Sequence, residues 1–217
     1  MKKSLILLKK YDVIQQCSVS HFVSHLRIKS IPRPALGKVS KGEKMTQNIS
    51  QTPIKPRFGA VENKIAVLFI CHGNICRSTM AQYIAQHLVT QFGMESNFYI
   101  DSAATSREEI GNPVHYGTRR KLEAEGIFCG DHRARQLKKS DYDEFDFLIG
   151  MDTQNIRNMY RILGEDPEQK VYKLLDFTER KGDIADPWYT GNFDLTYRDV
   201  LDGCRGLLKF IEEQESV

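Results

Sequence analysis

The chain has 217 residues, of which 41% are hydrophobic and 27% are charged, a composition typical of one soluble globular domain with an appendage. Its longest apolar run, Ile65–Cys71, is too short for a membrane span, and the start of the chain lacks the long apolar core and cleavage site of a secretory signal. The formal net charge is +3, and the five cysteines, at 17, 71, 76, 129 and 204, follow no disulfide-framework or Cys-x-x-Cys spacing. These features predict a cytoplasmic protein with no metal, no cofactor and no membrane partner.

The charge is unevenly distributed along the chain. Residues 1–62 hold 12 Lys and Arg against 3 Asp and Glu, a balance of +9, whereas residues 63–217 hold 19 against 25, a balance of −6. The first segment has no sustained periodicity and several prolines, so it is predicted to be a basic, disordered extension of a domain at 63–217. Lys41-Gly-Glu-Lys before Met45 suggests that translation starts at Met45 and that residues 1–44 are a mis-annotated start. We therefore expect no nucleic-acid partner.

Strand and helix patterns alternate from residue 64 onward. Strands are predicted at 64–71, 97–102, 146–151 and 171–175, and helices at 78–92, 113–125, 152–163 and 195–213. This alternation predicts an α/β fold with a parallel sheet covered by helices on both faces. Ligands of such folds bind at the carboxyl ends of the strands, and Cys71 lies at the end of the first one.

The loop after the first strand has the composition of an anion site that contains a nucleophile. Gly73 permits close approach, and Asn74 tolerates the left-handed backbone that a tight loop needs, so that successive N–H groups can converge on a phosphoryl group. Arg77 offers a planar fork to two oxygens, and the helix that begins near Ser78 adds its positive end. Cys71 as a thiolate would be the nucleophile, with Ser78 donating a hydrogen bond to it.

A second Cys-x₅-Arg spacing, Cys129 to Arg135, shows that the spacing alone is weak. No strand precedes Cys129, no hydroxyl residue follows Arg135, and Asp131 occupies the position where an anion would bind. Cys129 is predicted to be a buried or idle thiol.

Expulsion of an alkoxide or phenoxide requires a proton donor, and Asp186 is the best candidate. It lies on a stiff, loop-forming Asp186-Pro187 step and precedes Trp188 and Tyr189. These two aromatics could form the wall of a slot for an aryl substrate.

Together, Cys71-His-Gly-Asn-Ile-Cys-Arg-Ser78 and Asp186-Pro187 resemble the low-molecular-weight protein tyrosine phosphatase family, over about residues 64–213. The resemblance implies a four-stranded parallel sheet in a three-layer, flavodoxin-like open fold, and hydrolysis of phosphotyrosine in proteins without metal. It implies that Cys71 forms a phosphocysteine, that Arg77 and the loop amides stabilise the equatorial oxygens, and that Asp186 is the general acid and base.

The resemblance also assigns the surrounding residues. The phosphate- and substrate-binding set would be His72, Gly73, Asn74, Ile75, Cys76, Ser78, Trp188 and Tyr189. Cys76 matches the family's partner thiol, which forms a reversible disulfide with the nucleophile. The implied partners are tyrosine-phosphorylated proteins, and the protein is expected to be a monomer or weak homo-oligomer.

Two features depart from the family pattern. His72 stands where members often carry an apolar or small residue, and the loop after Thr105 lacks the aromatic that many members place against the substrate ring. Glu108 and Glu109 in that loop, near the mouth of the expected pocket, would repel acidic phosphopeptides unless Arg107 offsets them. They are interpreted as part of an exposed charged loop rather than as a specificity element.

Three alternatives remain open. Arsenate reductases on this scaffold use two additional, closely spaced cysteines, whereas Cys129 and Cys204 are 75 residues apart. Protein arginine phosphatases resemble the family with a threonine after the loop asparagine, where this chain has Ile75. The third is a non-catalytic phosphate-binding or redox module, which would not need Asp186.

Overall fold

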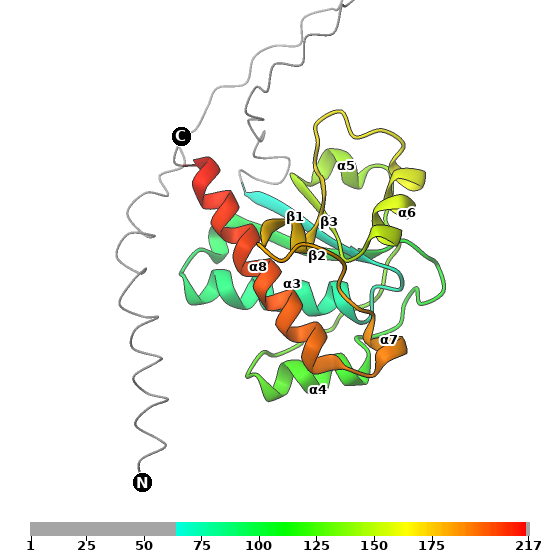
Figure 1. The fold of residues 1–217 in the computed structure, drawn as a ribbon, viewed down its shortest axis with the longest axis vertical. Helices are drawn as coiled ribbons and strands as arrows, with labels where there is room; N and C mark the ends of the chain where they lie inside the picture. The colour runs from blue at the N-terminus through cyan, green and yellow to red at the C-terminus, as the bar shows by residue number, and fades with distance from the viewer. Residues whose placement is uncertain (1–63, 216–217) are drawn as a thin grey trace, which may run out of the picture. The chain divides into compact units, whose positions relative to one another are not determined.

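The computed structural model describes residues 64–215 (Figure 1). The predicted disordered extension at 1–62 and the suggested start at Met45 lie outside the described residues. None of the helices described between residues 64 and 215 combines the length and apolarity that crossing a bilayer requires.

The described residues form one four-stranded parallel sheet. Its strands are β1 (Ile65–Cys71), β2 (Phe98–Ala104), β3 (Phe147–Gly150) and β4 (Val171–Lys173), in the order β2-β1-β3-β4. All four strands and their parallel arrangement were predicted from the sequence, and the α/β fold is confirmed. β1 lies between β2 and β3, and its last residue, Cys71, is at the carboxyl edge of the sheet.

Two strand ends differ from the prediction by two residues, and the other differences are of one residue. β2 continues two residues further, because Ala103 and Ala104 remain in register with Ile70 and Cys71. β4 is shorter, because the chain turns into the 3₁₀ helix η2 (Leu174–Phe177). The Asp176 carboxylate accepts a hydrogen bond from the backbone N–H of Lys173 (3.1 Å), which stabilises this early turn.

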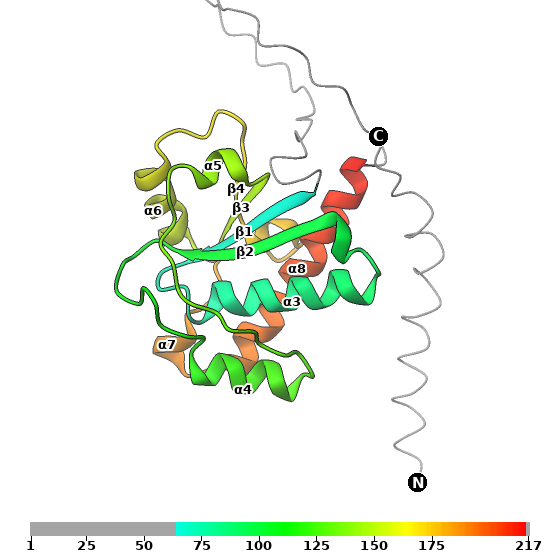
Figure 2. The same ribbon diagram turned by 180° about the vertical axis from the view of Figure 1, so that it is seen from behind.

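The four longer helices were also predicted. They are α3 (Arg77–Gln91), α4 (Tyr116–Ala124), α6 (Thr153–Leu163) and α8 (Phe193–Glu215). Figures 1 and 2 show α3 and α8 on one face of the sheet and α6 on the other, with α4 packed outside α3 and α8. The predicted three-layer arrangement is therefore present.

Besides η2, three short helical segments were not predicted: η1 (Glu95–Asn97), α5 (Asp141–Glu144) and α7 (Pro187–Thr190). Segments of three or four residues are too short to display a helical period of apolar residues. The interpretation of Asp186-Pro187 as a loop-forming step was wrong in this respect, because Asp186 is the N-cap of α7 and Pro187 is its first residue.

The core explains why Cys71 is held rigidly. Every residue of β1 is buried, and its alternate side chains face opposite layers. Ala66, Leu68 and Ile70 pack in one cluster with Met159 and Leu163 of α6. A strand buried on both faces has little freedom to move, so the residue at its end is a fixed point of the fold.

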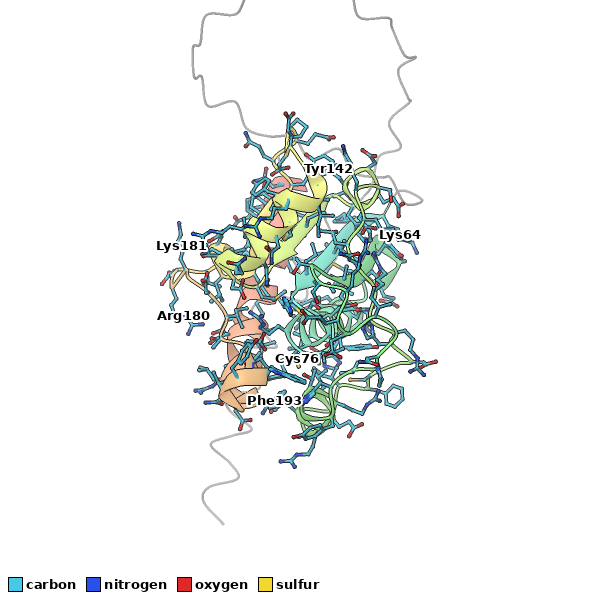
Figure 3. The ribbon with its side chains drawn as sticks, turned by 90° about the vertical axis from the view of Figure 1, so that its right-hand side faces the viewer. Lys64, Cys76, Tyr142, Arg180, Lys181 and Phe193 are labelled. Carbon is cyan, nitrogen blue, oxygen red and sulfur yellow. The ribbon has the colours of Figure 1, made fainter. Side chains whose placement is uncertain are left out.

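The carboxyl edge of the sheet gathers distant parts of the chain. Figure 3 shows Cys76 and Phe193 in the lower half of the described domain and Lys64 and Tyr142 in the upper half. The Phe193 ring, at the start of α8, packs against the buried Ile75 and Cys76. The last helix thus supports the loop that follows β1.

Candidate active site

Residues 71–76 form a tight loop between β1 and α3. Asn74 has φ 60°, the left-handed conformation that its residue type was predicted to tolerate. Its backbone N–H donates to the Cys71 sulfur (3.3 Å). α3 begins at Arg77 without a side-chain cap, so the N–H groups of its first turn and the positive end of its dipole face this loop. The loop is therefore built to stabilise an anion next to the Cys71 sulfur.

The Asn74 side chain organises a chain of buried hydrogen bonds. Its Oδ1 accepts from the backbone N–H of Arg135 (3.1 Å), and this fixes the orientation of the amide. Its Nδ2 then donates to Ser78 Oγ (3.0 Å) and to Ser102 Oγ (2.8 Å), and the Ser102 hydroxyl donates to Gln82 Oε1 (2.6 Å). The donor and the acceptor of each of these hydrogen bonds are thus defined.

The direction of these hydrogen bonds determines the role of the Ser78 hydroxyl. Its oxygen accepts from Asn74, and its single proton can point to the Cys71 sulfur, 3.1 Å away. A hydroxyl in this orientation stabilises the thiolate form of Cys71, the form that acts as a nucleophile. The geometry thus agrees with the role expected for Ser78.

His132 supports the loop from another side. Its Nε2 lies 2.9 Å from the carbonyl oxygen of Asn74, and because a carbonyl can only accept, Nε2 carries the proton. Burial lowers the pKa of His132, although the bond to Asn74 opposes this effect. His132, Ser102 and Gln82 were not predicted as site residues, since they lie outside the loop motif and only the fold brings them to it.

Arg77 is almost fully buried, with 3% of its side chain exposed. Nη1 donates to Asp152 Oδ2 (2.5 Å) and to the carbonyl of Ile184 (3.1 Å), and Nη2 donates to Asp186 Oδ2 (2.5 Å). Its Nε–H has no hydrogen-bond partner within residues 64–215 and can donate to a bound oxyanion. Asp152, the N-cap of α6, was not predicted as a site residue.

The hydrogen bond from Arg77 holds Asp186 beside the loop between β1 and α3. Its Oδ1 accepts from the backbone N–H of Trp188 (3.0 Å), and 20% of its side chain is exposed. Trp188 and Tyr189 are 56% and 83% exposed, so both rings are open to a ligand. The carboxyl group is thus held near Cys71 while remaining accessible from solvent.

One pocket joins most of the residues predicted from the sequence. It is lined by Cys71, His72, Gly73, Ile75, Cys76, Glu108, Glu109, Asp186, Trp188 and Tyr189. The remaining predicted residues, Asn74, Arg77 and Ser78, are buried, and both Asn74 and Ser78 hydrogen-bond Cys71. Glu108 and Glu109, which the sequence placed near the pocket mouth, also line the pocket.

The other thiols differ in their surroundings. Burial, reinforced by the nearby charge of Cys71, raises the pKa of Cys76 to about 12. Cys129 is buried, as predicted, and it does not line the pocket. Arg135, its apparent partner in the sequence, binds Asp101 and Asp141 instead (2.9 and 3.0 Å). Arg135 therefore serves in ion pairs within the fold rather than in an anion site with Cys129.

Comparison with known proteins agrees with this geometry. The family model described as low molecular weight phosphotyrosine protein phosphatase matches residues 66–217. Low molecular weight protein-tyrosine-phosphatase YfkJ of Bacillus subtilis is 39% identical over 155 residues, covering 70% of this chain and 99% of that protein.

Two solved structures extend the comparison. The crystal structure of YfkJ from Bacillus subtilis aligns with a TM-score of 0.67 and 40% identity, covering 69% of this chain and 96% of that one. The Drosophila arginine phosphatase aligns with a TM-score of 0.60 and 28% identity, covering 67% of this chain and 96% of that one.

Proposed function

The chain belongs to the low molecular weight phosphotyrosine protein phosphatase family, whose members are cysteine-dependent protein-tyrosine phosphatases, and we propose that Cys71, Arg77 and Asp186 carry out this reaction. In the first step the Cys71 thiolate attacks phosphorus and the bond to the tyrosine oxygen breaks, which gives a phosphocysteine. The hydrogen bonds from Asn74 and Ser78 to the sulfur support its role as the nucleophile.

Arg77 and the loop amides stabilise the charge on the transferring phosphoryl group. The free Nε–H of Arg77 and one Nη–H can bind two oxygens side by side. For this, Nη2 exchanges its bond to Asp186 for a phosphoryl oxygen, while Asp152 keeps Nη1 in place. Because the guanidinium is already buried and oriented, little reorganisation is needed when the transition state forms.

Asp186 acts on the leaving group. Released from Arg77, its protonated carboxyl donates to the departing phenolate, and its carboxylate then accepts a proton from the water that hydrolyses the phosphocysteine. The two roles need one group close to Cys71 and open to solvent. The observation that carries the proposal is that Asp186, 115 residues after Cys71 in the sequence, lines the same pocket.

Turnover of a substrate panel tests the proposal. We expect hydrolysis of phosphotyrosine peptides, little of phosphoserine or phosphoarginine peptides, and no reduction of arsenate. Ile75 supports the choice of an aryl group, because its apolar side chain lines the pocket, where a guanidinium would need polar partners. Neither Cys129 nor Cys204 lines the pocket, and this disfavours an arsenate relay. Phosphoarginine turnover above phosphotyrosine turnover would refute the assignment.

Cys76 is proposed to protect the nucleophile. After peroxide oxidises the Cys71 thiolate to a sulfenic acid, the Cys76 sulfur attacks it, water leaves, and a disulfide forms that cellular thiols can reduce. Both sulfurs line one pocket, but the raised pKa of Cys76 predicts that this closure is slow at neutral pH. We further propose a reducing, cytoplasmic compartment and monomeric or weakly associated protein acting on tyrosine-phosphorylated proteins.

A further inference from the structure

The mouth of the pocket has an acidic side, formed by Glu108 and Glu109 in the loop after β2. We propose that these two glutamates select phosphotyrosine substrates that carry a lysine or arginine next to the phosphotyrosine. This inference rests on the proposed function, since it concerns the substrate of the same pocket. The proposal replaces the interpretation of Glu108 and Glu109 as part of an exposed charged loop.

The loop that carries the glutamates is fixed to the phosphate-binding loop. The backbone N–H of Thr105 donates to the Cys71 carbonyl (2.8 Å), and that of Ser106 donates to the His72 carbonyl (2.9 Å). These bonds join the two loops just past the ends of β1 and β2. The position of the glutamates relative to the Cys71 sulfur is thus set by backbone hydrogen bonds rather than by a free loop.

Each glutamate is also held by its own side chain. Glu108 Oε2 accepts from His72 Nε2 (2.9 Å), and Glu109 Oε2 accepts from Asn112 Nδ2 (2.6 Å). The stem of Glu109 lies directly over Gly73, because a Cβ added to this glycine would come within 3.0 Å of the Glu109 Cγ. Each carboxylate is anchored through one oxygen, and the other oxygen can accept from a cationic group of a ligand.

The charges around the mouth favour a basic neighbour over an acidic one. Three carboxylates line the pocket, those of Glu108, Glu109 and Asp186, and the last of these is paired with Arg77. Among the residues that the structure describes, His72 is the only basic side chain in the lining. Arg107, which could have offset them, does not line the pocket, and its Nε donates to Gln136 (3.0 Å). A phosphopeptide with acidic flanking residues would therefore meet like charges, whereas a flanking ammonium or guanidinium would meet opposite ones.

Another part of the lining is suited to the phosphotyrosine ring itself. Trp188 and Tyr189 of α7 line the same pocket as the two glutamates and expose most of their surface. With the ring placed by these aromatics and by the Cys71 loop, a residue next to the phosphotyrosine is the part of the peptide expected to meet the glutamates. The aromatic and acidic residues of the lining thus divide recognition between the aryl group and the flanking charge.

Three phosphotyrosine peptides of one sequence, with lysine, alanine or glutamate on both sides of the phosphotyrosine, test the inference. We expect kcat/KM to be on the order of threefold to tenfold higher for the lysine peptide than for the alanine peptide, the range for one or two partly exposed ion pairs. The glutamate peptide should be the poorest substrate. The preference should fall as NaCl is added, because salt screens exposed charges.

Variants then assign the preference to the two glutamates. In Glu108→Gln together with Glu109→Gln, the lysine-to-alanine ratio of kcat/KM should fall to about one. The matched control is Glu95→Gln, which removes an exposed charge just before β2, at the opposite edge of the sheet, and should keep the wild-type ratio. A wild-type ratio near one, a preference for the glutamate peptide, or a ratio unaffected by the double substitution would overturn the inference while leaving the proposed function intact. Absence of turnover of all three peptides would instead overturn the proposed function.

Discussion

Replacing Asp186 by asparagine separates leaving-group protonation from phosphate binding. The carboxyl group has two contacts, one to the backbone N–H of Trp188 and one to the Arg77 guanidinium. The asparagine carbonyl can keep the first contact, so α7 retains its N-cap. The variant cannot donate a carboxyl proton to the leaving group, and it removes the anion that competes with phosphate for Arg77.

The substitution should lower kcat but should not weaken the binding of phosphate. Loss of a general acid should lower kcat on phosphotyrosine roughly 10²- to 10⁴-fold, about 2.7–5.4 kcal/mol in activation free energy. Tyrosine is a poor leaving group, with a pKa near 10, whereas aryl phosphates with more acidic phenols need less protonation and should lose less. Inhibition by inorganic phosphate should be as strong as in the wild type or stronger, because one negative charge has left the pocket.

The assay measures kcat across a series of aryl phosphates and the inhibition constant of phosphate. The matched control is Asp183→Asn in the same loop, where the carboxylate binds Lys173 and Thr153 outside the pocket. This control should keep the wild-type dependence on the leaving group. Equal losses on all aryl phosphates in Asp186→Asn, or weaker phosphate inhibition, would show that Asp186 is not the acid.

Three further predictions follow from the contacts around the loop. Arg77→Lys should lower kcat about 10²- to 10³-fold and weaken phosphate inhibition, since an ammonium cannot bind two oxygens side by side; unchanged phosphate inhibition would contradict this. At pH 7–8, iodoacetamide should alkylate Cys71 but leave Cys76 unmodified until urea unfolds the protein, because the pKa of Cys76 is about 12; equal modification in peptide mass maps would refute it. Burial lowers the folded-state pKa of His132 below its ordinary value of 6.5. As the pH falls, His132 is therefore protonated in the unfolded state before it is protonated in the folded state, and the free energy of unfolding should decrease as the pH drops below 6.5. His132→Gln should flatten this part of the curve of unfolding free energy against pH by up to about 1.4 kcal/mol per pH unit, whereas parallel curves for the two proteins would exclude the effect.

The main elements of the fold could be predicted from the sequence because their signals are local. Ile65–Cys71 is apolar throughout, as a strand buried on both faces must be, and the longer helices have enough residues to display a period. The limits of β4 and the existence of α7 were not predictable in this way. They depend on single contacts, the Asp176 turn and the Asp186 cap, that leave no periodic pattern.

The part of the candidate site whose residues are contiguous in the sequence could be predicted from it. Residues 71–78 carry the loop in one stretch, and the Asp-Pro step marks the distant acid. Asp152 and His132 were not assigned roles, because they reach the loop from 75 residues after Arg77 and from 58 residues after Asn74. Only the sheet order, which places the ends of β1, β2 and β3 side by side, brings these groups together.

The central claim is that phosphate passes through the sulfur of Cys71. Rapid acid quenching during turnover of a radiolabelled phosphotyrosine peptide, followed by peptide mapping, measures this directly. We predict label on the peptide that contains Cys71 in the wild type, and neither label nor turnover in Cys71→Ser. Turnover without label on Cys71 at any quench time, or sustained turnover by Cys71→Ser, would contradict the mechanism.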